Sequence, residues 1–332
     1  MKSFFGIIVA VCFSVTGLAE KPKVGFVLST LQEERYQRDR RVFTETAEKL
    51  GAEVFFVACN NNELVQTSQV DNLISRGVKV IVVQPVNGNA AANLVRSAKQ
   101  EGVKVVDYDR LIPNSPIDAY ITEDSFEVGR LQAEAVAQKL GGKGRVVLLM
   151  GQAGHSVAEA RTKGVVETLK KYPGIKIILQ QYHQGWSPAL AMRTVEDVLT
   201  RQQNKVDAII ANNSGMAHGA IQALEEQKLA GKVFVAGADA DLANIRNMVM
   251  GKQQFEVQIS IEKMASTAAE VAVKLARGES VTGDRVLKSG SYSVPTFDTP
   301  VYGITRDTLE ERVIKTGFHS REAVFGGLAQ SR

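Results

Sequence analysis

The stretch "KVIVVQPVNGNAAANLVRSAKQEGVKVVDYDR", residues 79–110, decides the fold class. It begins with a short apolar run and continues through a polar loop into the amphipathic segment "NAAANLVRSAKQEG", residues 89–102. It ends with a second apolar run, "KVVDYD", residues 104–109. Short runs rich in Val, separated by a helix-length amphipathic segment that ends at a glycine, are typical of a βαβ unit with parallel strands.

The same alternation extends over the rest of the chain. It begins at "KVGFVL", residues 23–28, and reaches "AYITED", residues 119–124, after which the pattern restarts. The second series has its apolar runs at residues 145–151, 175–182, 206–213 and 232–240. We therefore predict an α/β protein of two doubly wound parallel-sheet lobes. No low-complexity linker separates them, so short strand-like connections that can act as a hinge are expected.

The totals and the first residues narrow the class of protein. The 332 residues are enough for about two domains. The net charge of +4, from 40 basic and 36 acidic residues spread along the chain, favours neither nucleic acid nor a membrane surface as a partner. Lys2, the apolar run at residues 4–15 and the small residues Gly17 and Ala19 predict a secretory signal peptide over residues 1–19, although a buried strand or a membrane anchor has the same apolar character. We expect an exported, soluble, periplasmic protein with one remaining cysteine, Cys59, and no disulfide.

Polar and charged side chains gather where the predicted strands end. They follow as "STLQEERY" (29–36), "YDR" (108–110), "GQAGHSVAEAR" (151–161), "YHQGW" (182–186), "ANNSG" (211–215) and "GADAD" (237–241). In open α/β sheets, ligands bind outside these carboxyl ends. The segments contain no phosphate-binding glycine motif and no nucleophile–histidine arrangement, and the histidines lack metal spacing. We therefore expect no cofactor and no metal.

These side chains suit a sugar or a similar polyol. A guanidinium group presents a planar fork to neighbouring hydroxyl oxygens, a carboxylate accepts from hydroxyls, and an aromatic ring packs on the C–H face of a sugar. The residues that supply these groups are Arg35, Tyr36, Asp109, Arg110 and Trp186. The alternative interpretation is that the charged runs are solvated helix ends with surface ion pairs, and that Trp186 belongs to the core.

The chain resembles the periplasmic sugar-binding proteins of ABC importers. The resemblance is nearest to the xylose-binding type and more distant to the ribose-binding type, and it extends from about Pro22 to about His319. It is carried by a series of segments in order: "LQEERYQRDR" (31–40), "YDR" (108–110), "GWSPALA" (185–191), "KVDAIIANN" (205–213), "GADADLANI" (237–245) and "RVIKTGFH" (312–319). The resemblance implies two lobes joined by a three-strand hinge, which close over one sugar and have no catalytic activity.

The resemblance also implies a set of ligand residues. They are Arg35, Tyr36, Asp109, Arg110, Arg161, Trp186, Asn213 and Asp239, with Glu34, His155, Ser214 and Gln258 as further candidates. Three positions depart from the xylose type. The xylose type has an asparagine pair near the positions of His155 to Val157, where this chain resembles the ribose-type loop, whose arginine would be Arg161. Ser214 lies where the xylose type has Asp, and Ile259 where family members have Lys or Gln. These departures make the identity of the sugar an open question, with a xylose-like pentose or a related aldose as the expectation.

The expected organisation and partners follow from the resemblance. The N-terminal lobe should contain residues 20–122 and about 260–290, and the C-terminal lobe residues 123–259 and about 291–332. We expect a monomer that delivers its sugar to a membrane ABC permease. The alternative is an exported sensor that signals to a chemoreceptor or a sensor kinase. A repressor sharing this core would need a helix-turn-helix at its N-terminus, and an exported hydrolase would use Asp109 or Asp239 as acid and base.

Overall fold

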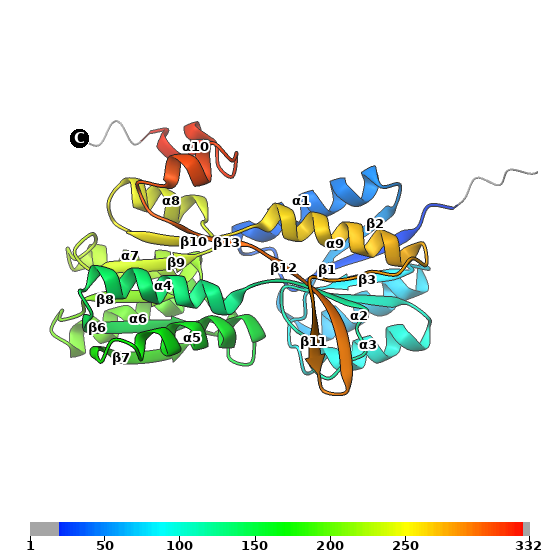
Figure 1. Ribbon diagram of the computed structural model, residues 1–332, viewed down its shortest axis with the longest axis horizontal. Coiled ribbons are helices and arrows are strands. Elements are labelled where there is room, and N and C mark those ends of the chain that lie inside the picture. The colour runs from blue at the N-terminus through cyan, green and yellow to red at the C-terminus, as the bar shows by residue number, and fades with distance from the viewer. Residues whose placement is uncertain (1–19, 328–332) are drawn as a thin grey trace, which may run out of the picture.

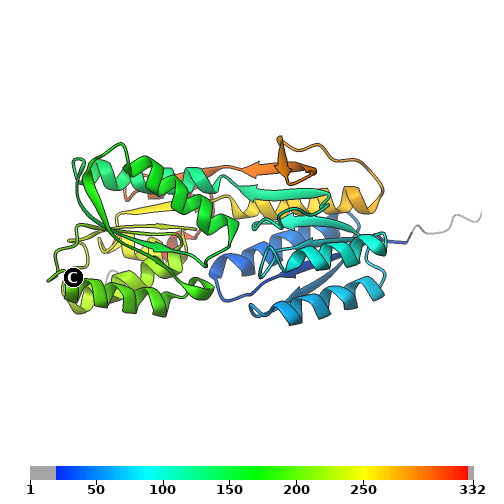
Figure 2. The same cartoon turned by 90° about the horizontal axis from the view of Figure 1, so that it is seen from below.

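The structure is a computed structural model and describes residues 20–327. Two α/β lobes lie end to end along the long axis, each with a central sheet covered by helices (Figures 1 and 2). The predicted fold class is therefore confirmed. The signal peptide predicted over residues 1–19 lies outside the described residues. Cys59 is buried and makes no disulfide among the described residues, and no helix within 20–327 is long and apolar enough to cross a membrane.

The N-terminal lobe is built on a seven-stranded sheet in the order β11-β12-β5-β4-β3-β1-β2. All neighbours are parallel except β11, which pairs antiparallel with β12 at one edge. Four helices, α1, α2, α3 and α9, cover this sheet. The elements are β1 (Lys23–Leu28), α1 (Glu34–Lys49), β2 (Glu53–Ala58), α2 (Glu63–Ser75), β3 (Val80–Val83), α3 (Ala91–Gln100), β4 (Lys104–Tyr108), β5 (Ala119–Glu123), α9 (Ile261–Ala276), β11 (Arg285–Ser289) and β12 (Tyr292–Thr299).

The C-terminal lobe has a six-stranded sheet in the order β13-β10-β9-β8-β6-β7, parallel except for the edge strand β13. The last described helix, α10, belongs to this lobe and packs against α8. The elements are α4 (Ser125–Lys139), β6 (Lys143–Met150), α5 (Ser156–Leu169), β7 (Gly174–Tyr182), η1 (Gln184–Trp186), α6 (Pro188–Arg201), β8 (Ala208–Ala211), α7 (Ser214–Glu226), β9 (Phe234–Ala238), α8 (Leu242–Val249), β10 (Phe255–Ile259), β13 (Val301–Ile304), η2 (Glu310–Ile314) and α10 (Arg321–Phe325).

The chain passes between the lobes three times, at Asp124, at Ser260 and at Pro300. The second and third crossings are joined by a hydrogen bond, which Ser260 Oγ donates to Pro300 O at 2.7 Å. The third crossing lies later than the expected position near residue 291. The reason is that β12 pairs in parallel with β5, which keeps residues 292–299 in the N-terminal lobe.

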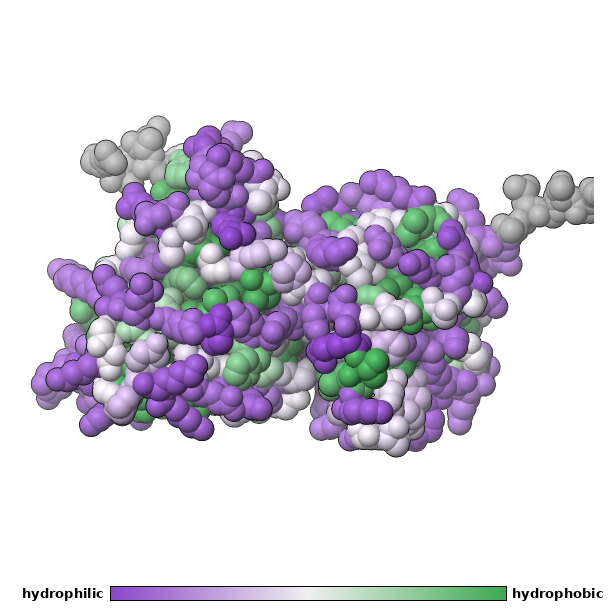
Figure 3. Space-filling view, in the orientation of Figure 1, coloured by the Kyte–Doolittle hydropathy of each residue, from purple (hydrophilic) through white to green (hydrophobic). Residues whose placement is uncertain are grey.

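The two lobes are closed on each other. Hydrogen bonds cross between them from Leu111 N to Ser156 Oγ (2.8 Å) and from Leu242 N to Glu34 Oε2 (3.0 Å). The space-filling view shows a largely polar face that narrows between the two lobes (Figure 3). The side chains at the strand exits are consequently enclosed between the lobes.

The backbones of α4 and α5, the first two helices of the C-terminal lobe, pack closely against each other. A Cβ atom on Gly129 would lie 1.9 Å from Arg161 O, and one on Gly164 would lie 2.1 Å from Phe126 O. Only glycine leaves room for two helix backbones at this distance. The two glycines thereby set the position of Arg161 relative to the first hinge strand.

Candidate functional site

A small cavity lies between the lobes at the carboxyl ends of both sheets. It brings together the eight residues that the resemblance implied as the main ligand set, together with Glu33 and Val157. Its lining is Glu33, Arg35, Tyr36, Asp109 and Arg110 from the N-terminal lobe, and Val157, Arg161, Trp186, Asn213 and Asp239 from the C-terminal lobe. Arg110 and Trp186 thus share one cavity although they belong to different lobes.

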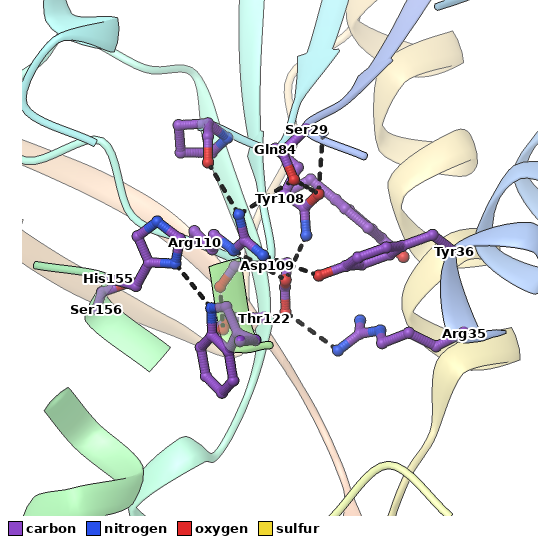
Figure 4. A network of polar contacts seen from close by, with 12 residues as sticks. Ser29, Arg35, Tyr36, Gln84, Tyr108, Asp109, Arg110, Thr122, His155 and Ser156 are labelled. Atoms are coloured by element: carbon purple, nitrogen blue, oxygen red, sulfur yellow. Dashed lines mark hydrogen bonds and ion pairs between the residues drawn. The ribbon is translucent and has the colours of Figure 1, made fainter. Parts of the chain in front are cut away.

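Asp109 is the centre of the N-terminal wall (Figure 4). Its carboxylate accepts hydrogen bonds from Gln84 Nε2 at 2.6 Å and from Arg35 Nη1 at 3.4 Å. Gln84 is itself held by Ser29, whose hydroxyl donates to Gln84 Oε1 at 2.7 Å. Burial alone would raise the pKa of Asp109, but the guanidinium groups of Arg35 and Arg110 outweigh it and lower the pKa. Asp109 is therefore a fixed, ionised acceptor.

Arg110 is held by its own lobe (Figure 4). It donates to Ser29 Oγ at 3.1 Å and to Tyr36 Oη at 3.0 Å, and less closely to Pro85 O at 3.4 Å. Its side chain is almost wholly buried. The guanidinium plane is therefore oriented before a ligand arrives, which lowers the entropy lost on binding.

Arg161 is the corresponding cation of the C-terminal wall. It donates to Asn212 O at 2.5 Å, to Glu123 Oε1 at 2.9 Å and to Asp239 Oδ1 at 3.2 Å. Glu123 is the last residue of β5, so Arg161 connects the C-terminal lobe to the first hinge strand. Burial raises the pKa of Asp239, and the adjacent guanidinium of Arg161 opposes this rise without cancelling it.

Trp186 is fixed on two sides. Its indole N–H donates to His155 Nδ1 at 3.0 Å, so the other ring nitrogen of His155 carries the proton and donates to Val86 O of the opposite lobe at 2.9 Å. Burial, with a further contribution from Arg110, lowers the pKa of His155 to about 3 and keeps it neutral. The indole ring also lies against Gly151, where a Cβ atom would come within 2.5 Å of it. His155 is thus a positioning residue for Trp186.

Three residues of the cavity have a left-handed backbone. The φ angles are +67° at Asp109, +56° at Trp186 and +102° at Asp239. Such angles are unfavourable for residues with a Cβ atom, and they cluster at functional sites, where the surrounding structure enforces them. Each of the three follows directly after a strand or forms part of the turn that leaves one. The surrounding fold therefore holds these three residues in an unfavourable backbone conformation in which they line the cavity.

The cavity also has unused hydrogen-bonding capacity. Among the described residues, the buried atoms Glu33 Oε2, Arg35 Nη2 and Arg161 Nε have no hydrogen-bond partner. Buried polar atoms without partners cost about 1–3 kcal/mol each. In this closed arrangement the cavity measures about 20 Å³, roughly enough for one water molecule. A ring-sized ligand can therefore enter only when the lobes separate, and its hydroxyl groups can satisfy these donors and this acceptor.

The four further candidates do not line the cavity. Glu34 points across the cleft mouth and accepts from Leu242 N, and His155 contacts Trp186 rather than the cavity. Ser214 lies behind the wall, where its hydroxyl donates to Glu256 Oε2 at 3.0 Å. Gln258 is a residue of β10, whose exit leads into the hinge rather than into the cleft. The lining of this cavity therefore does not include these four candidates, and their role in binding stays a prediction.

Sequence reasoning missed four residues that shape the site. Glu33 lines the cavity and precedes Arg35 by two residues. Asp39 and Asp109 hold Arg35, both at 3.4 Å. Two of the missed residues had a recognisable pattern in the sequence. Gln84 directly follows the apolar strand β3, and Glu123 is the last residue of the apolar strand β5, so both lie at the edge where a site is expected.

Known proteins with similar sequences and structures agree with this two-lobed fold and its cleft. Residues 24–280 match the family described as the periplasmic binding protein domain. The chain belongs to the periplasmic binding protein family. It is 40% identical over 309 residues to the D-xylose-binding periplasmic protein of Escherichia coli K12, covering 92% of this chain and 93% of that protein. It is 27% identical over 293 residues to the ribose import binding protein RbsB of the same organism, covering 87% of this chain and 93% of that protein.

Among solved structures, a carbohydrate transporter solute-binding protein from Chloroflexus aurantiacus in complex with D-glucose superposes with a TM-score of 0.85. It is 26% identical, and the match covers 91% of this chain and 98% of that one. The resemblance stated from the sequence, nearer to the xylose type than to the ribose type, is thereby confirmed. Within residues 20–327, no group of His, Cys, Asp or Glu side chains is arranged to hold a metal ion.

Of the three departures from the xylose type, only Val157 lines the cavity. Ile259 is wholly buried in the hinge strand β10, and Ser214 lies behind the wall. A difference in sugar preference between this protein and the xylose type should therefore arise first at Val157, which offers an apolar contact where an amide would hydrogen-bond.

Proposed function

We propose that this protein binds one neutral monosaccharide, a xylose-like pentose or a related aldose, between its lobes and delivers it to the permease of an ABC importer. The proposed ligand residues are Arg35, Tyr36, Asp109, Arg110, Arg161, Trp186, Asn213 and Asp239, with Glu33 and Val157 added by the cavity lining. The name of the Escherichia coli relative favours D-xylose as the first sugar to test.

One observation carries the proposal. Three residues that line one cavity from both lobes each have a buried polar atom without a partner among the described residues: Glu33 Oε2 and Arg35 Nη2 in one lobe, and Arg161 Nε in the other. A hydroxyl group is both donor and acceptor, so a polyol can serve guanidinium and carboxylate groups together. A charged ligand would leave one of the two kinds of group unpaired.

Closure of the lobes is the expected consequence of binding. A ligand that contacts Asp109 in one lobe and Asp239 in the other stabilises only the closed state, and its differential affinity for that state drives the equilibrium. Hydrogen bonds to charged groups contribute about 1.5–3 kcal/mol each. A few of them, less the costs of ordering, are enough for micromolar affinity, about −8 kcal/mol. The permease then distinguishes closed from open protein.

A thermal-shift screen tests the proposal. The chain without residues 1–19 is heated with pentoses, hexoses and sugar alcohols. A sugar at about a hundred times its Kd should raise the free energy of unfolding by about 2.7 kcal/mol. Growth of a strain lacking the protein on the sugar so identified tests the transport role. If no sugar raises the melting temperature, the proposal fails.

A further inference from the structure

A second, larger cavity opens beside the sugar site at the mouth of the cleft. This cavity, here called the vestibule, lies between the β1–α1 loop of the N-terminal lobe and the loops that begin α6, α7 and α8. Its volume is about 410 Å³, compared with about 20 Å³ for the inner cavity. Glu33, Trp186 and Asn213 line both, so the two spaces share a wall.

The vestibule has the chemistry of a sugar site. Trp186 and Pro188 provide apolar faces, Gln184 and Asn213 provide amides, and Glu33 and Asp241 provide carboxyl groups. Flat apolar faces with amide and carboxyl groups around them suit the C–H faces and hydroxyl groups of a sugar ring. The lining contains no Lys or Arg. An anionic group would therefore meet carboxyl groups in the vestibule itself, while the nearest guanidinium groups, those of Arg35 and Arg110, line the inner cavity, which favours a neutral occupant.

Two carboxyl groups of the vestibule lack donors. Glu33 Oε2 is buried with no partner among the described residues. Asp241 occupies the N-cap position of α8, yet its side chain makes no capping hydrogen bond. Burial raises the pKa of both carboxyl groups. The neighbouring Glu34, in contrast, already accepts from Leu242 N. Hydroxyl groups of a ligand can donate to the buried Oε2 of Glu33 and to the half-buried carboxyl group of Asp241.

We propose that the vestibule binds a second, neutral sugar unit attached to the one in the inner cavity, so that the protein accepts disaccharides as well as monosaccharides. This inference rests on the proposed function. Glu33 stands between the two units and accepts from a hydroxyl of either. Trp186, which lines both spaces, packs against the outer unit.

The test compares a monosaccharide with its 1,4-linked disaccharide by titration calorimetry. The probes are D-xylose with xylobiose, and D-glucose with cellobiose. For at least one pair, the unmodified protein should bind both members with affinities within about tenfold of each other. Ala243→Trp places an indole in the vestibule from an exposed position. It should weaken the disaccharide by about thirtyfold or more and the monosaccharide by less than about twofold.

Two further variants keep the test decisive. Ala189→Trp is the matched control, since Ala189 is equally exposed in the first turn of α6 but does not line the vestibule. It should leave both affinities unchanged. Asp241→Asn, which keeps the shape of the side chain, should weaken only the disaccharide, by about threefold to tenfold. Circular dichroism confirms that each variant folds.

The outcomes separate the two proposals. If monosaccharides bind and neither disaccharide does, the vestibule inference is overturned and the proposed function stands. If Ala243→Trp and Ala189→Trp weaken the disaccharide equally, the inference is also overturned. If no sugar binds to the unmodified protein, the proposed function itself is lost.

Discussion

The sharpest structural prediction concerns Gly151, which supports the only tryptophan of the chain. A Cβ atom at this position would lie 2.5 Å from two atoms of the Trp186 ring and 2.6 Å from a third. Favourable carbon contacts begin at about 3.5 Å, so Gly151→Ala must push the indole by about 1 Å. The ring cannot yield freely, because its N–H is bonded to His155. The backbone of Gly151 is not left-handed, so the alanine adds no strain of its own.

Overpacking of this kind costs about 1–3 kcal/mol. Because Trp186 lines the cavity, we expect the cost to appear in sugar binding, as a loss of affinity of about fivefold to 150-fold. Calorimetry of four proteins measures it: the unmodified chain, Gly151→Ala, Trp186→Phe and the double variant. The contacted atoms belong to the outer ring of the indole, and phenylalanine lacks that ring. The alanine should therefore cost little in the Phe background. An equal cost in both backgrounds would refute the reasoning.

Three other predictions concern charge. The ratio of the sugar affinity of His155→Gln to that of the unmodified protein should be higher at about pH 5 than at about pH 7.5. The reason is that the pKa of His155 is about 3 in the closed form and near 6.5 in water. The neutral imidazole therefore supports closure fully above pH 6.5, and this support is lost as the pH falls, which weakens the affinity by up to about thirtyfold at pH 5. Burial raises the pKa of Glu256 to about 8. The carboxyl group ionises more readily in the unfolded chain, so the free energy of unfolding falls by about 2–3 kcal/mol between about pH 6 and pH 8. Urea unfolding of Glu256→Gln should show a flatter pH profile, and an unchanged slope would contradict this. Arg161→Met leaves Glu123 and Asp239 buried without their cation and should lower the free energy of unfolding by about 3–5 kcal/mol, with partial rescue by Glu123→Gln; a loss below about 1 kcal/mol would contradict it.

The sequence was sufficient to predict the alternation of strands and helices and the edge at which the site lies. Parallel strands share their carboxyl edge, so Asp109 and Asp239 could be placed at the cleft from local pattern alone. Their backbone strain could not be read from composition, although aspartate tolerates the left-handed region better than most residues.

Long-range pairing set the limit of the prediction. Residues 292–299 carry no local signal for either lobe, and only their pairing with β5 keeps them in the N-terminal sheet. Likewise, side chains within one turn of a helix start point in different directions, so Glu33 lines the cavity while Glu34 contacts Leu242. The contact of Glu123 with Arg161 depends on the α4–α5 crossing set by Gly129 and Gly164, which no single segment reveals.

Trp186 offers the most direct measurement of the central claim, that two lobes close over a sugar held between opposed charged groups. It is the one tryptophan in the sequence and is 6% exposed at the cleft. Its fluorescence during titration with D-xylose and other aldoses should change and saturate for at least one sugar, and Asp109→Ala should abolish the change. A flat signal with every sugar, or an equal change in the Asp109→Ala variant, would contradict the account.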